Sequence, residues 1–290
     1  MTQLSVHGGG TEILPANNFR WPTGKRLGVF FRVAFEGWAD GAWPGIGPMG
    51  NPLKLGYPDL NAIGFAEYGP RRGIWRALST LDDYGVKATI LVCGIMAERY
   101  PDAVRAISDA GHDVVAHSYA MDVMPAYLSE EEERANIRRT ADLIEGVTGK
   151  RPTGWISPRG TPSLRTAKLL IDEGFTWHGD SLNHDLPYVV KFDTGSIVSF
   201  SSNMECNDLP LSLRYGNPPS VMVDIFKDWL EYARLFEKGA ARIDPTIHSH
   251  VFGRPTGMSA FRKILDIAVP AEDVWIGTRS AVAALLLKNT

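Results

Sequence analysis

Strand-length apolar runs alternate with helical segments along most of this 290-residue chain. The apolar runs predict strands at residues 26–35, 87–93, 113–117, 154–156, 197–201, 245–250 and 274–276, with a weaker one near 175. The segments between them predict helices at residues 71–84, 101–110, 129–146, 163–173, 218–238, 258–267 and 280–288. An alternation of this kind predicts an α/β fold whose parallel sheet is closed or nearly closed as a barrel. It does not by itself decide between a barrel and an open sheet.

The chain length suits one large α/β barrel or two smaller domains. We expect a single domain over residues 1–290, with an N-terminal extension at 1–25 and a long loop at 38–70. The loop is rich in Gly and Pro, and long loops in compact domains usually carry function. Its apolar residues predict that it packs over the mouth of the barrel or against a neighbouring subunit. These residues are Trp43, Ile46, Met49, Leu53, Leu55 and Tyr57.

The composition is that of an ordinary globular protein, with 44% hydrophobic and 22% charged residues. A net charge of −3 and the lack of a long basic run argue against nucleic acid and anionic membranes as partners. Cys93 and Cys206 do not form a disulfide framework, and no apolar run has signal-peptide or membrane-spanning length. No glycine-rich nucleotide motif or nucleophile elbow is present. We therefore expect a cytoplasmic enzyme with a small-molecule substrate and no nucleotide cofactor.

Polar side chains follow the predicted strands at the positions where barrel enzymes place their chemistry. Glu36 comes directly after the first strand, among aromatic residues, which predicts a raised pKa; the alternative is a solvated loop glutamate. His117 ends the third strand and is either functional or a core histidine bonded to the backbone. Arg159, between Pro and Gly, either orients a carboxylate or carbonyl group or only fixes its loop.

Two further clusters lie later in the chain. Residues 180–188 contain too many polar and aromatic side chains for a plain turn, which predicts a substrate-contact loop. His248 and His250 form a His-x-His pair at a strand end, where a straight strand would point both rings to one face, as in a metal site. A bend would instead separate the rings and leave one of them catalytic or structural. Trp38 is a further candidate for the wall of a pocket.

Together these segments resemble the polysaccharide deacetylase (NodB-homology) superfamily over residues 26–284. Within that superfamily they are most similar to the branch that contains the metal-independent bacterial allantoinase. The resemblance implies a distorted (β/α) barrel of about seven strands, assembled as a homotetramer. It is carried by residues 67–76, 110–117, 148–155 and 180–188, by His248 with the Gly-Arg-Pro at 253–255, and by residues 273–275.

The chain departs from the metal-dependent members of this superfamily. Their first motif supplies two aspartates, and here Phe35 and Glu36 occupy that region. Their His-x-x-x-His pair begins at His117, but Met121 takes the place of the second histidine. A single histidine falls short of the three protein ligands that a catalytic zinc normally takes. We therefore expect neither a metal nor a cofactor.

The resemblance and the residues at the strand ends predict a hydrolase of non-peptide C–N bonds that acts on a small cyclic amide, imide or ureide. Glu36 is the expected general base and His248 the general acid, while Arg159 and His117 orient the carbonyl and stabilise the oxyanion. Met121 is expected to supply apolar surface for a flat ring. The expected substrate-binding residues are Trp38, Met121, Asp180, Asn183, His184, Tyr188 and His250.

Two alternatives stay open at this point. The first is a metal-dependent N-deacetylase of an amino sugar or polysaccharide, whose ligands would come from His117, His248, His250 and either Asp122 or Asp180. The second is a non-catalytic barrel that only binds a small molecule.

Overall fold

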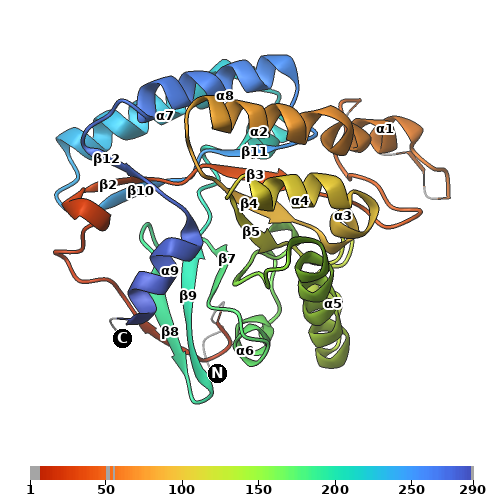
Figure 1. Ribbon diagram of the computed structural model, residues 1–290, viewed down its shortest axis with the longest axis horizontal. Helices are drawn as coiled ribbons and strands as arrows, with labels where there is room; N and C mark the ends of the chain where they lie inside the picture. Colours follow the sequence, from red (N-terminus) through yellow and green to blue (C-terminus); the bar gives the residue numbers. More distant parts are fainter. Residues whose placement is uncertain (1–6, 50–52, 55, 289–290) are drawn as a thin grey trace.

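The computed structural model describes residues 7–49, 53–54 and 56–288, and its centre is a nine-stranded sheet (Figure 1). The seven strands from β9 to β11 run parallel, while β8 and β1 are added antiparallel at one edge. This confirms the predicted fold class. In spatial order the strands are β1 (Thr11–Ile13), β8 (Tyr188–Phe192), β9 (Gly195–Ser201), β7 (Trp177–Ser181), β6 (Gly154–Trp155), β5 (Asp113–Ala116), β4 (Thr89–Val92), β3 (Arg32–Phe35) and β11 (Thr246–His248).

A parallel contact continues the curvature of the sheet beyond β11. Thr246 on β11 forms an isolated parallel bridge with Asn207, and its N–H donates to the carbonyl of Cys206 at 2.9 Å. Residues 206 and 207 follow β9 in the chain, so this contact brings the segment after β9 next to β11. The carboxyl ends of the parallel strands therefore surround a common space, as in a barrel.

A second, three-stranded sheet consists of β10 (Ala241–Ile243), β2 (Leu27–Val29) and β12 (Val274–Ile276). The chain passes from β2 into β3 and from β10 into β11 with only two residues between the strands in each case. Phe30 N donates to the carbonyl of Ile243 at 3.0 Å, and Arg32 N donates to that of Pro245 at 3.0 Å. The single strand predicted at residues 26–35 is thus bent into two, each in a different sheet.

Helices cover the outside of the large sheet, with α2, α7 and α8 on one side and α3, α4 and α5 on another (Figure 1). A capping box opens α5, because the Ser129 side chain accepts from Glu132 N and the Glu132 side chain accepts from Ser129 N. None of the helices within the described ranges is long and apolar enough to span a membrane. Their bounds are α1 (Leu60–Tyr68), α2 (Ile74–Asp83), α3 (Gly94–Arg99), α4 (Pro101–Asp109), α5 (Glu130–Thr148), α6 (Thr166–Asp172), α7 (Ser220–Leu235), α8 (Pro255–Ala268) and α9 (Arg279–Lys288).

Three segments differ from the sequence prediction. The expected loop at 38–70 contains helix α1, which a π-helical turn at Gly69–Gly73 joins to α2. The expected N-terminal extension contributes β1, whose three exposed residues pair with β8. The expected loop at 180–188 is shorter than predicted and covers residues 182–187, since Asp180 and Ser181 end β7 and Tyr188 begins β8. Each of these elements is short or depends on a partner far away in the chain, so local periodicity did not reveal it.

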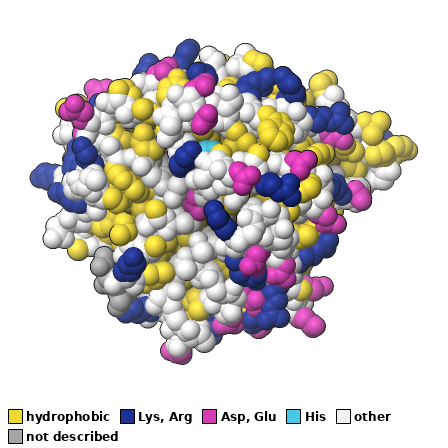
Figure 2. Space-filling model, in the orientation of Figure 1, with side chains coloured by type: hydrophobic (Ala, Val, Ile, Leu, Met, Phe, Trp, Pro, Cys, Tyr) yellow, Lys and Arg dark blue, Asp and Glu magenta, His cyan; other side chains and the backbone are white. Residues whose placement is uncertain are grey.

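The apolar segment after Trp38 remains partly exposed. Met49, Leu53 and Tyr57 are more than half exposed, at 78%, 54% and 65%. Leu55 lies outside the described residues. The prediction that this segment contacts a neighbouring subunit stays a prediction. Acidic and basic side chains are mixed over the face shown in Figure 2.

A close backbone approach holds the segment that carries His248. A Cβ added to Gly73 would lie 1.8 Å from the carbonyl oxygen of Ser249, and one added to Gly253 would lie 2.0 Å from the same oxygen. Glycine is therefore required at both positions by packing, and the π-helical turn acts as the support for the residue that follows His248.

We expect Gly73→Ala to displace Ser249 and to lower the free energy of unfolding by about 1–3 kcal/mol, the usual cost of overpacking. Gly146→Ala is the matched control, because Gly146 lies inside α5 and a Cβ there meets nothing within 4 Å. It should stabilise the protein by up to about 1 kcal/mol through helix propensity. Urea unfolding of both variants checks this, and equal effects at the two positions would contradict the packing argument.

Candidate active site

A cavity of about 190 Å³ opens at the carboxyl ends of the parallel strands. Its wall includes residues that directly follow or end six strands of the sheet, β3, β5, β6, β7, β9 and β11. This is the place where barrel enzymes assemble catalytic groups from separate strands. The predicted site residues that line it are Glu36, His117, Met121, Arg159, Asp180 and His248.

Glu36 lies between two histidines in this cavity. Its Oε1 is 3.3 Å from Nε2 of His248 and 3.5 Å from Nε2 of His117. Its Oε2 is buried and has no hydrogen-bond partner among the described residues. The carboxylate is therefore held by the two imidazoles through one oxygen, while the other oxygen keeps its full capacity to accept a hydrogen bond.

Asp208 fixes His248 from the opposite side. Its Oδ1 lies 2.6 Å from Nδ1 of His248, and its Oδ2 accepts the backbone N–H groups of His248 at 2.7 Å and Phe252 at 3.1 Å. Burial disfavours the imidazolium, but the charges of Glu36 and Asp208 overcome this effect and raise the pKa of His248 to about 10. His248 is thus an imidazolium at neutral pH, with Nε2–H directed at Glu36.

The predicted raised pKa of Glu36 is wrong. Burial does raise the pKa of this carboxyl, but the charge of His248 and hydrogen bonds from His117 and His248 outweigh it, so the pKa lies well below its ordinary value. The prediction considered only the aromatic residues next to Glu36 in the sequence. The histidines that determine its pKa come from distant strands. Glu36 and His248 therefore form a buried ion pair.

His117 is oriented by the neighbouring strand. Its Nδ1 donates to the carbonyl of Ile156 at 2.5 Å, which turns Nε2 toward Glu36. Met121 lines the same cavity, and its backbone N donates to the carbonyl of Gly37 at 2.9 Å. The thioether therefore occupies the wall of the site beside the carboxylate and the imidazole.

Arg159 lies exposed at the rim of the cavity, in a turn that follows β6. It has φ 58°, in the left-handed region that a non-glycine residue rarely adopts. Its guanidinium makes no hydrogen bond or ion pair with the described part of the chain. Strained backbone at the edge of a site, with a free cationic side chain, is an arrangement typical of ligand binding.

Asp180 also lines the cavity, but its two oxygens are engaged. Oδ1 accepts the backbone N–H of Ser157 at 2.7 Å, and Oδ2 accepts the Ser157 hydroxyl at 2.7 Å. Burial raises the pKa of Asp180 to about 6. Asp180 therefore positions the Ser157 turn that leads to Arg159.

Five predicted substrate-binding residues do not line this cavity. Asn183 and Tyr188 bond each other, and His184 bonds Leu186 in its own loop, because the hairpin of β8 and β9 carries this segment away. His250 lies beyond a bend after β11, with its ring against Trp38 and Phe65, and burial lowers its pKa to about 4. The predicted substrate-contact loop is therefore wrong for Asn183, His184 and Tyr188. The prediction that His248 and His250 point to the same face is also wrong.

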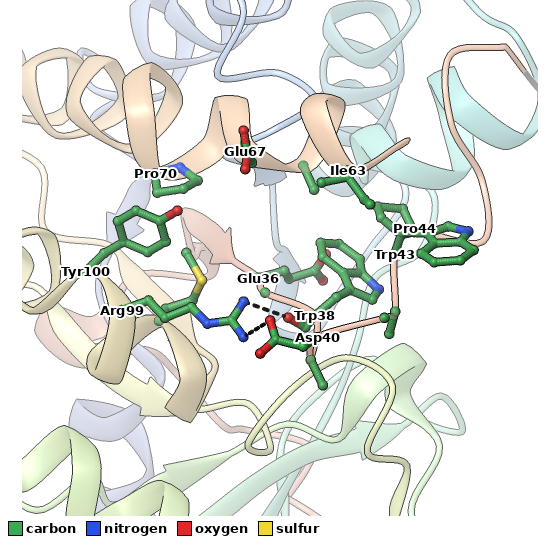
Figure 3. A pocket seen from close by; sticks show the side chains of 16 residues that line it. Glu36, Trp38, Asp40, Trp43, Pro44, Ile63, Glu67, Pro70, Arg99 and Tyr100 are labelled. Carbon is green, nitrogen blue, oxygen red and sulfur yellow. Dashed lines mark hydrogen bonds and ion pairs between the residues drawn. The ribbon is translucent and has the colours of Figure 1, made fainter. Parts of the chain in front are cut away.

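The fifth of these residues, Trp38, borders a neighbouring cavity of about 220 Å³ (Figure 3). Glu36 borders both cavities. In the second one, Arg99 pairs with Asp40 at 2.7 Å and donates to the carbonyl of Trp38 at 3.2 Å. Glu36 is therefore the dividing wall between two spaces.

The donor set does not fit a catalytic zinc. Across residues 7–49, 53–54 and 56–288 no group of three or more His, Cys, Asp or Glu side chains is arranged to hold a metal ion. His250 is turned away, and Asp122 accepts the backbone N–H of Ala39 at 2.9 Å rather than lining the cavity. Met121 offers a thioether, a poor ligand for zinc.

Asp208 is a candidate site residue that the sequence prediction missed. It follows Asn207 at the start of a π-helical turn, Leu209–Arg214, and no motif marks it. A carboxylate in the segment after a barrel strand was the available signal, but the sequence did not show which histidine it would meet.

Comparisons with known proteins show which family this chain resembles. The family model for polysaccharide deacetylase matches residues 65–178. The peptidoglycan deacetylase of Helicobacter pylori is 27% identical over 248 residues, covering 75% of this chain and 84% of the relative.

Solved structures extend the likeness to most of the chain. The PuuE allantoinase has a TM-score of 0.83 and 25% identity, covering 91% of each chain. A probable polysaccharide deacetylase from Pseudomonas aeruginosa has a TM-score of 0.81 and 25% identity, covering 91% of this chain and 92% of that one. These findings confirm the predicted class, a hydrolase that acts on C–N bonds other than peptide bonds. Over residues 65–178 the chain matches the polysaccharide deacetylase family model, and over most of its length it is similar to solved structures of this kind.

Proposed function

We propose that this protein hydrolyses the C–N bond of a small cyclic amide, imide or ureide without a metal ion. The observation that carries the proposal is the buried ion pair of Glu36 and His248, with Asp208 behind the histidine. A cavity of about 190 Å³ suits a small ring better than a polymer chain.

Glu36 activates the water. Its free Oε2 accepts a proton as the water oxygen attacks the carbonyl carbon. In the resting protein the carboxylate is a weak base, because the His248 charge stabilises its ionised form. A substrate that enters between Glu36 and His248 lengthens their contact and makes the carboxylate more basic.

His248 protonates the leaving nitrogen. Asp208 engages Nδ1, so that the Nε2 proton points into the cavity. When the C–N bond breaks, this proton moves to the nitrogen, and the proton taken from water remains on Glu36 until the site resets. Arg159 and His117, which line the same cavity, are the proposed donors to the negative charge on the carbonyl oxygen. Met121 supplies the adaptable apolar wall against which a flat ring rests.

We expect Glu36→Gln to lower kcat on cyclic amides roughly 100-fold or more, the usual contribution of a general base. Glu67→Gln is the control, because Glu67 lies in the neighbouring cavity and pairs with Arg71 at 2.7 Å. Steady-state kinetics of both variants with a panel of cyclic amides, imides and ureides checks this expectation. Wild-type turnover in Glu36→Gln would exclude the proposed base.

Asp208→Asn should move the alkaline limb of the kcat/KM profile to lower pH. His248 must be protonated to act as an acid, so activity is lost as the pH rises through its pKa of about 10, and Asp208 is one of the two charges that raise this value. A structural role alone would lower activity equally at all pH values.

The same shift predicts how stability depends on pH. The pKa of His248 is raised on folding, so its stabilising contribution is full below about 6.5 and is lost as the pH rises through about 10. Melting temperatures of wild type and Asp208→Asn across this range provide the folding control for the kinetic experiment.

A metal-dependent N-deacetylase of amino sugars is the competing function, and metal analysis distinguishes the two. Protein purified without chelator should hold no stoichiometric zinc and should keep its activity in chelator. Met121→His should weaken substrate binding without creating zinc-dependent activity, because Phe35 still replaces a carboxylate. A zinc-dependent hydrolase produced by that single change would overturn the proposal.

A further inference from the structure

The cavity does not end at the ion pair but continues down the inside of the barrel. Arg32, Ala34 and Glu36 alternate along one strand and its end, so their side chains point to the same face, and all three line the cavity. On the adjacent strand Thr246 is in register with Arg32 and His248 with Ala34. The small side chain of Ala34 leaves the space through which the upper and lower parts are continuous.

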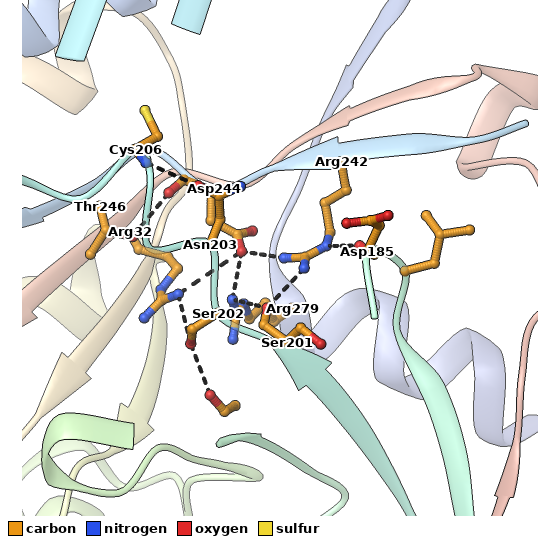
Figure 4. Close-up of polar contacts among 12 residues, drawn as sticks. Arg32, Asp185, Ser201, Ser202, Asn203, Cys206, Arg242, Asp244, Thr246 and Arg279 are labelled. Atoms are coloured by element: carbon orange, nitrogen blue, oxygen red, sulfur yellow. Dashed lines mark hydrogen bonds and ion pairs between the residues drawn. The ribbon is translucent and has the colours of Figure 1, made fainter. Parts of the chain in front are cut away.

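Below this space lies a buried cluster in which three arginines converge on one aspartate. Asp244 pairs with Arg242, with Arg279 at 2.7 Å and with Arg32 at 3.9 Å (Figure 4). Arg242 and Arg279 also donate to the carbonyl of Ser201, at 2.8 and 3.3 Å. Three buried guanidinium groups thus share one carboxylate. The carboxylates of Asp180 and Asp113 also act on Arg32 and Arg279 through their charge, but neither forms an ion pair with them. Buried charges are normally paired directly, so the incomplete pairing of these guanidinium groups leaves a place for an anion.

Arg32 has the weakest contacts of the three arginines. Besides its long contact with Asp244, it has one hydrogen bond, to the Ser202 hydroxyl at 3.4 Å. Its Nε is buried without a partner in the part of the chain that the structure describes, although the side chain is only 4% exposed. Burial and then the charge of Arg279 lower the pKa of Arg32 below its ordinary range, which reflects this poor compensation.

The two carboxylates that line the cavity do not pair with Arg32, because each has another partner. Asp180 is occupied by Ser157, and Glu36 is neutralised by His248. Two exposed arginines, Arg159 and Arg214, line the outer part of the same cavity. Cationic groups at both ends of a pocket favour the entry of a negatively charged ligand.

We propose that Arg32 is the anion subsite of this pocket and binds a carboxylate group of the substrate. The inference rests on the proposed function and narrows its substrate class to a cyclic amide, imide or ureide that carries a carboxylate. The carboxylate pairs with the Arg32 guanidinium at the floor, where the Ser202 and Thr246 hydroxyls lie, and the ring is held near Glu36 and His248. A planar guanidinium is suited to this role because it binds carboxylates in a bidentate manner.

Binding tests the subsite independently of turnover. Isothermal titration calorimetry compares acetate, glutarate and hydantoin-5-acetate with their uncharged amides, on wild type, Arg32→Met and Arg32→Lys. We expect at least one carboxylate to bind wild type about tenfold or more tightly than its amide, because hydrogen bonds to charged groups are the strong ones. Arg32→Met should abolish this preference, and Arg32→Lys should keep part of it.

Two controls keep the result specific. Arg105→Met removes an exposed arginine of α4 and should leave the preference unchanged. Arg32→Met removes one of three like charges around Asp244, so it should melt no lower than wild type. Should it fail to fold, Arg32→Lys and the wild-type preference still decide the question.

Three outcomes would overturn the inference. The first is the absence of any carboxylate preference in wild type. The second is a preference that survives Arg32→Met. The third is tight binding of chloride or phosphate that does not compete with the carboxylates, since this would mean a free-anion site rather than a substrate subsite. Glu36→Gln should retain the preference while losing turnover, so failure of the subsite and failure of the proposed chemistry are distinguishable.

Discussion

The ion pair between Glu36 and His248 is the interaction on which the rest of the site depends. It joins the ends of two adjacent parallel strands, β3 and β11, inside a buried space. Neither charge would be tolerated there alone, because an unpaired buried charge costs several kcal/mol. Asp208, His117 and the Ile156 carbonyl then fix the orientation of the pair, so that polar groups from three separate segments support one contact. The result is a carboxylate and an imidazolium that are both preorganised before any ligand enters.

The sequence was sufficient to predict that strand ends would converge, and it identified Glu36, His117, Arg159 and His248 as neighbours. This succeeded because a parallel α/β sheet brings the carboxyl ends of its strands to one edge whatever the details of packing. It failed for the pKa of Glu36, because the direction of that shift depends on distances between groups more than 80 residues apart. Asp208 was missed for the same reason: its role comes from a tertiary contact without any local pattern.

The hairpin of β8 and β9 explains a different kind of error. Residues 180–188 have the composition of a binding loop, but Tyr188 is buried at the start of a strand and Asn183 bonds to it. The many polar residues of this segment therefore form hydrogen bonds within the protein instead of a binding loop. His250 shows a related limit, since alternation along a strand predicts a shared face only while the strand continues, and β11 ends at His248.

The bent strands that run from the small sheet into the large one have a further consequence. Phe30 and Phe31, at the bend between β2 and β3, belong to different hydrophobic clusters and point to opposite sides of the chain. The residues that carry Glu36 and His248 are thus clamped at their far ends by a layer that contributes no atom to the cavity. The small sheet fixes one end of each of the two bent segments, and the ion pair lies at their opposite ends. Trp275 stacks on Trp21 in that layer. Changes in the packing beneath Trp275 would therefore alter the orientation of Glu36 and His248 in the site.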